Sequence, residues 1–126
     1  MAVEASTVQD TLGTRRLRLG MVGGGEGAFI GAVHRMAARL DDQYELVAGA
    51  LSATPERALR SGQALGLPAD RIYVSYPKMA QAERRRADPI DAVAIVTPNH
   101  LHAAVATEFL NHGFHVICDK PLSLNL

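Results

Sequence analysis

Short apolar runs alternate with helical stretches along most of this chain, and the alternation restricts the folds open to it. In the helical stretches, apolar residues recur every three or four positions, as on one face of a helix. Strands that alternate with helices pair in parallel through right-handed crossovers. The sequence therefore predicts an α/β fold, a doubly wound parallel sheet. The five strands it predicts are Leu17–Val22, Tyr44–Leu51, Ile72–Val74, Ala92–Val96 and His115–Cys118.

The helices are predicted from apolar spacing and from residues typical of helix ends. Phe29, Val33, Met36, Ala37 and Leu40 recur at helical steps after the first strand. Capping residues and left-handed glycines predict where the other helices begin and end. These are a helix from Pro55 to Leu65 capped by Thr54, a helix over Pro77–Arg86, and a helix capped by Asn99 and closed by Gly113.

Composition excludes several function classes. The chain has 126 residues, with 13 Lys+Arg against 13 Asp+Glu, so it lacks the net basic charge typical of proteins that bind nucleic acid or anionic membranes. No apolar run approaches the roughly 20 residues of a membrane helix. One cysteine, Cys118, cannot form an internal disulfide and is typical of a reducing cytoplasm. We expect a disordered lead-in over residues 1–14 and one domain over 15–126.

A glycine-rich turn (GGGEGA) begins at Gly23, between the first strand and the first helix. A dinucleotide pyrophosphate needs such a turn, because side chains must be absent where phosphates approach the backbone and helix N–H groups must face the anion. Gly23 would make the tight turn, Gly25 would allow close approach, and Ala28 would allow the helix to pack on the strand. Gly27 and Gly31 could share these roles. The alternative is an ordinary glycine-rich turn.

The end of the second strand bears on which dinucleotide would bind. NAD sites usually place an acid there for the ribose 2′-hydroxyl, whereas this chain has Ser52 and no acid. Ser52 leaves room for a 2′-phosphate, and Arg57 could supply positive charge. These residues favour NADP over NAD. The alternative is that Ser52 and Thr54 only cap the helix and that Arg57 is solvated.

Two further tracts follow the last two predicted strands, at the sheet edge where ligands of open α/β sheets bind. One runs from Thr97 to His102 (TPNHLH), and the other from Val116 to Pro121 (VICDKP). With the glycine turn, these tracts resemble the N-terminal nucleotide-binding domain of the Gfo/Idh/MocA family, named for glucose-fructose oxidoreductase, inositol dehydrogenase and a rhizopine catabolism protein. The resemblance covers residues 17–122. The tract after the second strand is similar to that of glucose-fructose oxidoreductases, which hold NADP.

The resemblance implies roles for the residues in these tracts. Lys120 is the predicted catalytic residue, which would place the nicotinamide and the substrate hydroxyl; its alternative is a surface lysine. Asp119 stands where the family usually has glutamate and would contact the nicotinamide ribose. His102 matches a family histidine near the ribose, with a structural role as its alternative. No metal site is predicted. The predicted cofactor-binding residues are Gly23, Gly25, Gly27, Ala28, Ser52, Arg57, Thr97, Pro98, Asn99, His102, Asp119, Lys120 and Pro121.

The resemblance also implies that this chain is a truncated part of an NAD(P)-dependent oxidoreductase. Family enzymes are longer and carry an α/β substrate domain, which we expect to be absent here, leaving the sheet incomplete at its C-terminal edge. The parent would transfer a hydride between a sugar or cyclitol hydroxyl carbon and the nicotinamide, and this chain alone would be inactive. The open edge strand predicts association with another copy. The alternatives are a non-catalytic nucleotide-binding module or remnant, and a domain that binds no nucleotide.

Overall fold

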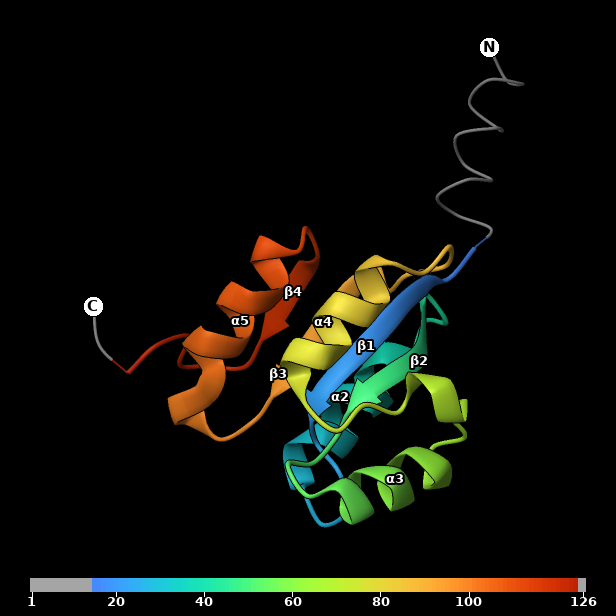
Figure 1. Ribbon diagram of the computed structural model, residues 1–126. Coiled ribbons are helices and arrows are strands. Elements are labelled where there is room, and N and C mark those ends of the chain that lie inside the picture. Colours follow the sequence, from blue (N-terminus) through green and yellow to red (C-terminus); the bar gives the residue numbers. More distant parts are fainter. Residues whose placement is uncertain (1–14, 125–126) are drawn as a thin grey trace.

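The computed structural model describes residues 15–124, which form one parallel sheet with helices on both faces (Figure 1). The predicted lead-in, residues 1–14, lies outside the described residues. The strands are β1 (Leu17–Gly23), β2 (Tyr44–Ala50), β3 (Ala92–Val96) and β4 (His115–Cys118), in the spatial order β2-β1-β3-β4. The doubly wound parallel sheet is confirmed. The helices are α2 (Phe29–Arg39), α3 (Pro55–Ala64), α4 (Tyr76–Arg84) and α5 (His102–Asn111), with short 3-10 turns at Ala69–Arg71 and Asn99–Leu101.

The predicted strand Ile72–Val74 is wrong, so the described sheet has four strands rather than five. Ile72 makes a single isolated parallel bridge to Gly49 of β2. The neighbouring Tyr73 N–H donates to the Gly49 carbonyl at 2.8 Å. The chain then turns into α4 at Tyr76, before a second rung of the ladder can form. Three apolar residues between two turns suffice for a contact with the sheet edge, but not for a strand.

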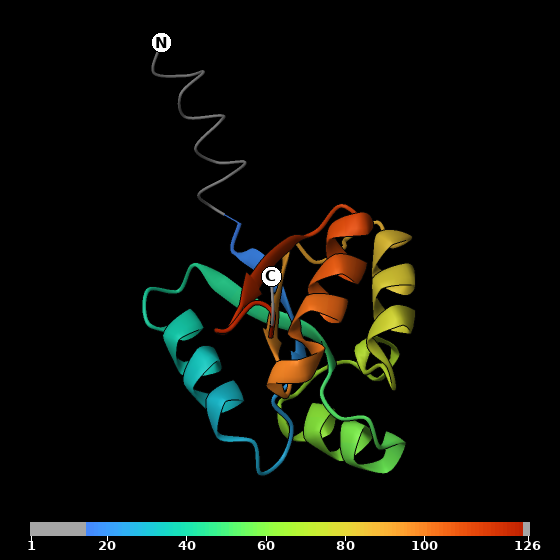
Figure 2. The ribbon, with the colours of Figure 1, turned by 90° about the vertical axis from the view of Figure 1, so that its left-hand side faces the viewer.

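The core is divided by the sheet into two layers, because successive strand residues point to opposite faces. Val93 and Ile95 of β3 face α4 and α5, where they pack with Met79 and Phe109. The alternate residues, Ala94 among them, belong to a second cluster. Figure 2 shows α2 on one side of the sheet and α4 with α5 on the other.

Helix α2 forms where its apolar spacing predicts, but the large side chains of the predicted apolar stripe face outward. Their exposed fractions run from 41% at Val33 to 83% at Leu40. Ile30 and Ala38 pack against the sheet instead. Gly31, the buried residue of this helix, sets the rotation, since its backbone lies against the glycine turn. The outward residues are Phe29, Val33, Met36 and Leu40.

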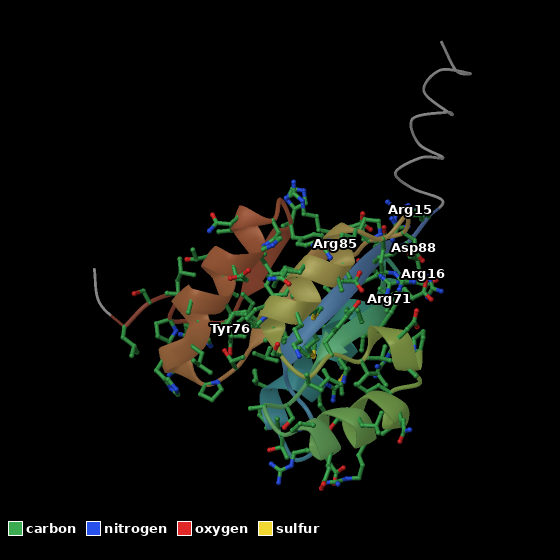
Figure 3. The ribbon with its side chains drawn as sticks, in the orientation of Figure 1. Arg15, Arg16, Arg71, Tyr76, Arg85 and Asp88 are labelled. Atoms are coloured by element: carbon green, nitrogen blue, oxygen red, sulfur yellow. The ribbon has the colours of Figure 1, made fainter. Side chains whose placement is uncertain are left out.

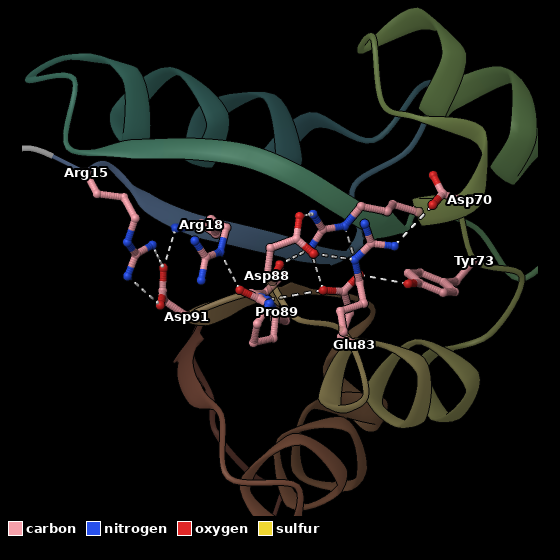
Figure 4. Close-up of polar contacts among 11 residues, drawn as sticks. Arg15, Arg18, Asp70, Tyr73, Glu83, Asp88, Pro89 and Asp91 are labelled. Carbon is pink, nitrogen blue, oxygen red and sulfur yellow. Dashed lines mark hydrogen bonds and ion pairs between the residues drawn. The ribbon is translucent and has the colours of Figure 1, made fainter. Parts of the chain in front are cut away.

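A buried ion pair joins α4 to the turn before it, at the end of the sheet where the strands begin (Figure 4). Arg71 Nη2 lies 2.6 Å from Glu83 Oε1, and both side chains are buried. The Tyr73 hydroxyl donates to Glu83 Oε2 at 2.7 Å, and the Ile90 N–H donates to Oε1 at 3.1 Å. Burial, together with this bond to Glu83, raises the pKa of Tyr73 far above its usual range. One carboxylate therefore accepts hydrogen bonds from three residues, Arg71, Tyr73 and Ile90.

Among residues 15–124, no helix is both long enough and apolar enough to cross a membrane. The two edge strands of the sheet are β2 and β4, and Ile117 of β4 is partly exposed.

Candidate functional site

The site lies where the connections leaving β1 and β3 go to opposite faces of the sheet. These strands are neighbours, with Gly23 paired to Val96 at their carboxyl ends. In open α/β sheets, the crevice at such a point is where ligands bind. A cavity of about 690 Å³ opens there, lined by the turns after β1, β2 and β3 and by the start of α4.

The glycine turn after β1 has a backbone that side chains would disrupt. Gly23, Gly24 and Gly27 have φ angles of 83°, 74° and 84°, in the left-handed region that favours glycine. A Cβ atom at Gly23 would lie 2.9 Å from the Thr97 backbone nitrogen, and one at Gly24 would lie 2.8 Å from Val96 Cγ2. The turn can therefore pack closely against the end of β3 because these positions have no side chain.

Two further glycines bring helix and strand close to this turn. A Cβ at Gly31 would lie 2.5 Å from Gly24 Cα, so Gly31 provides the close helix packing that the sequence analysis assigned to Ala28. Ala28 is exposed and lines the cavity. A Cβ at Gly25 would lie 2.6 Å from the Leu51 carbonyl oxygen, so a side chain at Gly25 would clash within the protein before meeting any ligand.

The glycine turn is held by two side chains that the sequence analysis did not identify. Ser61 of α3 accepts a hydrogen bond from the Glu26 N–H at 2.9 Å. Arg35 of α2 donates to the Gly24 carbonyl at 2.8 Å. Partial burial lowers the pKa of the Arg35 guanidinium, with a smaller effect from Arg39. Neither residue carries a local signal, since a serine or an arginine within a helix is usually solvated.

At the end of β2, Ser52 and Arg57 line the same cavity, as the sequence analysis predicted for the ribose end. The Ser52 hydroxyl accepts a hydrogen bond from the Thr54 N–H at 3.2 Å. Thr54 holds the N-cap position of α3, but its own side chain makes no capping bond. Arg57 is exposed, so its guanidinium is accessible to an anion in the cavity.

At the end of β3, Thr97 and Pro98 line the cavity. The Thr97 hydroxyl is buried and has no hydrogen-bond partner, the one such side-chain atom among residues 15–124. A buried polar atom without a partner is unfavourable, and a ligand could supply the partner. Asn99 begins a 3-10 turn and does not cap α5 with its side chain, so its predicted capping role is wrong.

The tract after β4 stands beside this cavity rather than in its lining. The Asp119 N–H donates to the Ile95 carbonyl at 3.3 Å, and the Asp119 carboxylate lies 3.9 Å from His34 of α2. Lys120 and Pro121 are exposed. Burial, followed by the charge of Asp119, raises the pKa of the Cys118 thiol. Cys118 lies on the edge strand β4 and is partly buried.

His102 and Gly27 also lie outside the lining of the main cavity. The His102 ring is buried, 1% exposed, and contacts the carbonyls of Thr97 and Pro121. Gly27 lines a separate cavity of about 440 Å³ between α2 and α3.

The start of α4 contributes residues that the sequence analysis missed. Tyr76 and Pro77 line the main cavity, and Ser75 caps α4 by accepting from the Lys78 N–H at 3.4 Å. In Figure 3, Tyr76 lies toward one end of β1, and Arg71 and Asp88 lie toward the other end. A serine with a proline two residues later is a helix-start signal, and it could have placed this turn. In the part of the chain that the structure describes, no cluster of three or more His, Cys, Asp or Glu residues could hold a metal ion.

Comparison with known proteins agrees with this architecture. The model of an oxidoreductase family with an NAD-binding Rossmann fold matches residues 17–126. The uncharacterized oxidoreductase YfiI of Bacillus subtilis is 41% identical over 110 residues, which make up 86% of this chain and 28% of YfiI. An oxidoreductase from Sinorhizobium meliloti is 65% identical in its crystal structure, with a TM-score of 0.83 over 86% of this chain and 30% of that one.

A third relative was crystallised with ligands. This inositol dehydrogenase homolog from Azotobacter vinelandii, complexed with NADH and myo-inositol, is 41% identical, with a TM-score of 0.86 over 88% of this chain and 29% of that one. The present chain thus spans less than a third of the length of these relatives. From the family match and these likenesses, the chain belongs to the Gfo/Idh/MocA oxidoreductase family, in which residues 17–126 form the NAD-binding Rossmann domain.

Proposed function

We propose that the cavity at the carboxyl ends of β1 and β3 binds NAD(P), and that the full-length protein transfers a hydride between a sugar or cyclitol hydroxyl carbon and the nicotinamide. The observation that carries this proposal is the glycine turn, which packs closely against the end of β3 and lines the cavity. The NADH and myo-inositol in the Azotobacter vinelandii relative support the class of cofactor and substrate.

The residues present fit a dinucleotide at this site. A pyrophosphate needs a backbone without side chains and a helix N-terminus free of negative charge. The glycine turn supplies the backbone, and the first turn of α2 holds no acidic residue. Glu26, within the glycine turn, is paired with Arg60 at 3.6 Å, which offsets its charge. The buried Thr97 hydroxyl offers a polar contact that no protein atom uses.

Lys120 is proposed as the catalytic residue of the full-length protein. When bound, the nicotinamide supplies the chemistry of hydride transfer. A lysine ammonium beside the reacting hydroxyl would favour the negative charge that develops on its oxygen. Because the acid/base partners implied by the family belong to a substrate domain, we expect the 126-residue chain to bind dinucleotide without turning over substrate.

Cellular location and association complete the proposal. We place the protein in the cytoplasm, since its one cysteine has no partner for an internal disulfide. The open edge of β4 is proposed to pair with a second copy, because unpaired strand edges are templates for pairing.

Cofactor preference is the first prediction, measured by calorimetric titration of this chain with NADP⁺ and with NAD⁺. We expect NADP⁺ to bind more tightly, because Ser52 leaves room for the 2′-phosphate and Arg57 offers it a charge. Ser52→Asp should shift the preference toward NAD⁺ by roughly tenfold, the effect of about 1.4 kcal/mol of charge repulsion.

Arg57→Ala should lower the affinity for NADP⁺ and leave the affinity for NAD⁺ unchanged. The matched control is Arg85→Ala, at the end of α4. Equal affinities in every variant would contradict the 2′-phosphate assignment. No binding of either dinucleotide to the folded chain would contradict the proposed function.

A second prediction concerns the unpartnered hydroxyl of Thr97. Thr97→Val keeps the shape and removes the polar atom, so we expect stability to rise by about 1 kcal/mol, since a buried unpaired group costs about 1–3 kcal/mol. Dinucleotide affinity should fall by roughly threefold to tenfold, as for one lost hydrogen bond. Urea unfolding and calorimetry measure the two effects. Unchanged affinity would mean that the cofactor does not contact this hydroxyl.

A further inference from the structure

His102 is a buried polar side chain that the dinucleotide cavity does not use. It stands at the first position of α5 and is 1% exposed. Its Nε2 lies 2.9 Å from the carbonyl oxygen of Thr97, in the turn after β3. Its Nδ1 lies 2.6 Å from the carbonyl oxygen of Pro121, in the tract after β4. One ring thus connects the two tracts at the carboxyl edge of the sheet.

Both partners of the ring are backbone carbonyls, which can only accept hydrogen bonds. A neutral imidazole has one N–H, so it can bond one carbonyl and must turn a lone pair toward the other. Only a ring with protons on both nitrogens makes both bonds. We propose that His102 is a positioning residue which, doubly protonated, clamps the Thr97 turn and the Pro121 tract together.

A positive charge on the ring is opposed by burial and by its place at the N-terminal end of α5, and it is favoured by the two carbonyls that face its nitrogens. The two carbonyl dipoles point their negative ends at the nitrogens, at hydrogen-bond distance. The charged residues nearest in sequence to Pro121 are Lys120 and Asp119, and the Asp119 carboxylate in turn lies 3.9 Å from His34 of α2. The remaining neighbours on α5 are apolar, with Val105 and Ala106 buried beside the first turn.

The clamp matters because of what lies between its ends. The Asp119 N–H is bonded to the Ile95 carbonyl, and the Pro121 carbonyl is bonded to His102. Lys120 stands between these two bonds, so its backbone is held on both sides. The consequence for the cofactor rests on the proposed function, in which Lys120 faces the nicotinamide. The clamp itself does not depend on that function.

Nitrogen NMR of the isotopically labelled 126-residue chain at neutral pH tests the protonation directly. We expect both His102 ring nitrogens to show the shifts of protonated imidazolium, with two N–H protons protected from exchange with water. His112 is the internal comparison, because only its Nδ1 is in contact, at 2.8 Å from the Glu108 carbonyl and 3.4 Å from the Glu108 carboxylate. A His102 ring with one N–H would overturn the two-donor clamp.

Two variants test the positioning role. His102→Phe fills the ring volume without donors, and His102→Gln keeps one amide donor group; His115→Gln, on the exposed start of β4, is the matched control. We expect the Asp119 amide to exchange roughly fivefold to tenfold faster in His102→Phe, as for one lost hydrogen bond, and to a smaller degree in His102→Gln. Exchange in β1 and in the control should not change.

A folded His102→Phe with unchanged exchange at Asp119 would overturn the positioning role. If that variant does not fold, His102→Gln and the NMR of the natural chain decide. We also expect NAD⁺ and NADP⁺ affinities to fall together in His102→Phe. If the natural chain binds neither dinucleotide, the proposed function fails, while the ring shifts and the Asp119 exchange still decide the clamp.

Discussion

Glu83→Ala is expected to lower the free energy of unfolding by about 3–5 kcal/mol, the cost of breaking a buried ion pair by removing one partner. The buried Arg71 guanidinium would keep its charge and lose its carboxylate. The Tyr73 hydroxyl and the Ile90 N–H would lose the same acceptor. Urea unfolding followed by circular dichroism measures the loss. Since small domains are stable by only about 5–15 kcal/mol, the variant will be close to unfolding at ambient temperature.

The matched control for Glu83→Ala is Asp88→Ala. Asp88 also lies near Arg71, at 3.4 Å, but its side chain is largely exposed to water. Water can replace an exposed carboxylate, so the control should lose far less stability than Glu83→Ala. A similar loss in both variants, or a loss under about 1 kcal/mol for Glu83→Ala, would contradict the role of burial in this network.

Gly31→Ala is expected to disrupt the dinucleotide site from a position that does not line the cavity. The added Cβ would stand 2.5 Å from Gly24 Cα and 2.8 Å from the Gly24 carbonyl oxygen, so helix or turn must move. Forcing one extra carbon into a packed contact costs about 1–3 kcal/mol. Because the displaced segment is the glycine turn, affinity for NAD⁺ and for NADP⁺ should fall at least about tenfold. Calorimetric titration with both dinucleotides measures this loss.

Ala32→Ser is the control for Gly31→Ala, because it adds one atom at the next residue of α2, on the exposed side. We expect its affinity and its stability to match the natural chain. Retained affinity in a folded Gly31→Ala would show that the glycine turn tolerates displacement, and that the pyrophosphate does not depend on its position.

The strands and helices could be predicted because each depends on neighbours in the sequence. The run Ala92–Val96 is apolar at every position, and the structure buries all of it between two helical layers. The glycine turn was also recognisable, since the left-handed backbone at Gly23, Gly24 and Gly27 favours glycine. The roles within that turn were not, because the close contact of Gly31 with Gly24 joins residues seven positions apart.

Two features could not be predicted from the sequence, because they depended on which other segments each part of the chain packs against in the folded structure. The run at Ile72 has strand composition, but α4 begins too soon for a ladder. The α2 stripe has core composition, but the packing of Gly31 turns it outward. In both cases the local pattern was typical of the predicted element or face, but the segments packed around it gave it a different environment.

By itself, the sequence determined the order of strands and helices, the glycine turn and the resemblance that identifies the family. The tertiary structure decided which candidates meet. It placed Ser52, Arg57 and Thr97 around one cavity, and joined Thr97 to Pro121 through His102. The physical reason is range: backbone preference and periodicity act between near neighbours, whereas cavities, buried ion pairs and shared acceptors form only when distant segments pack together.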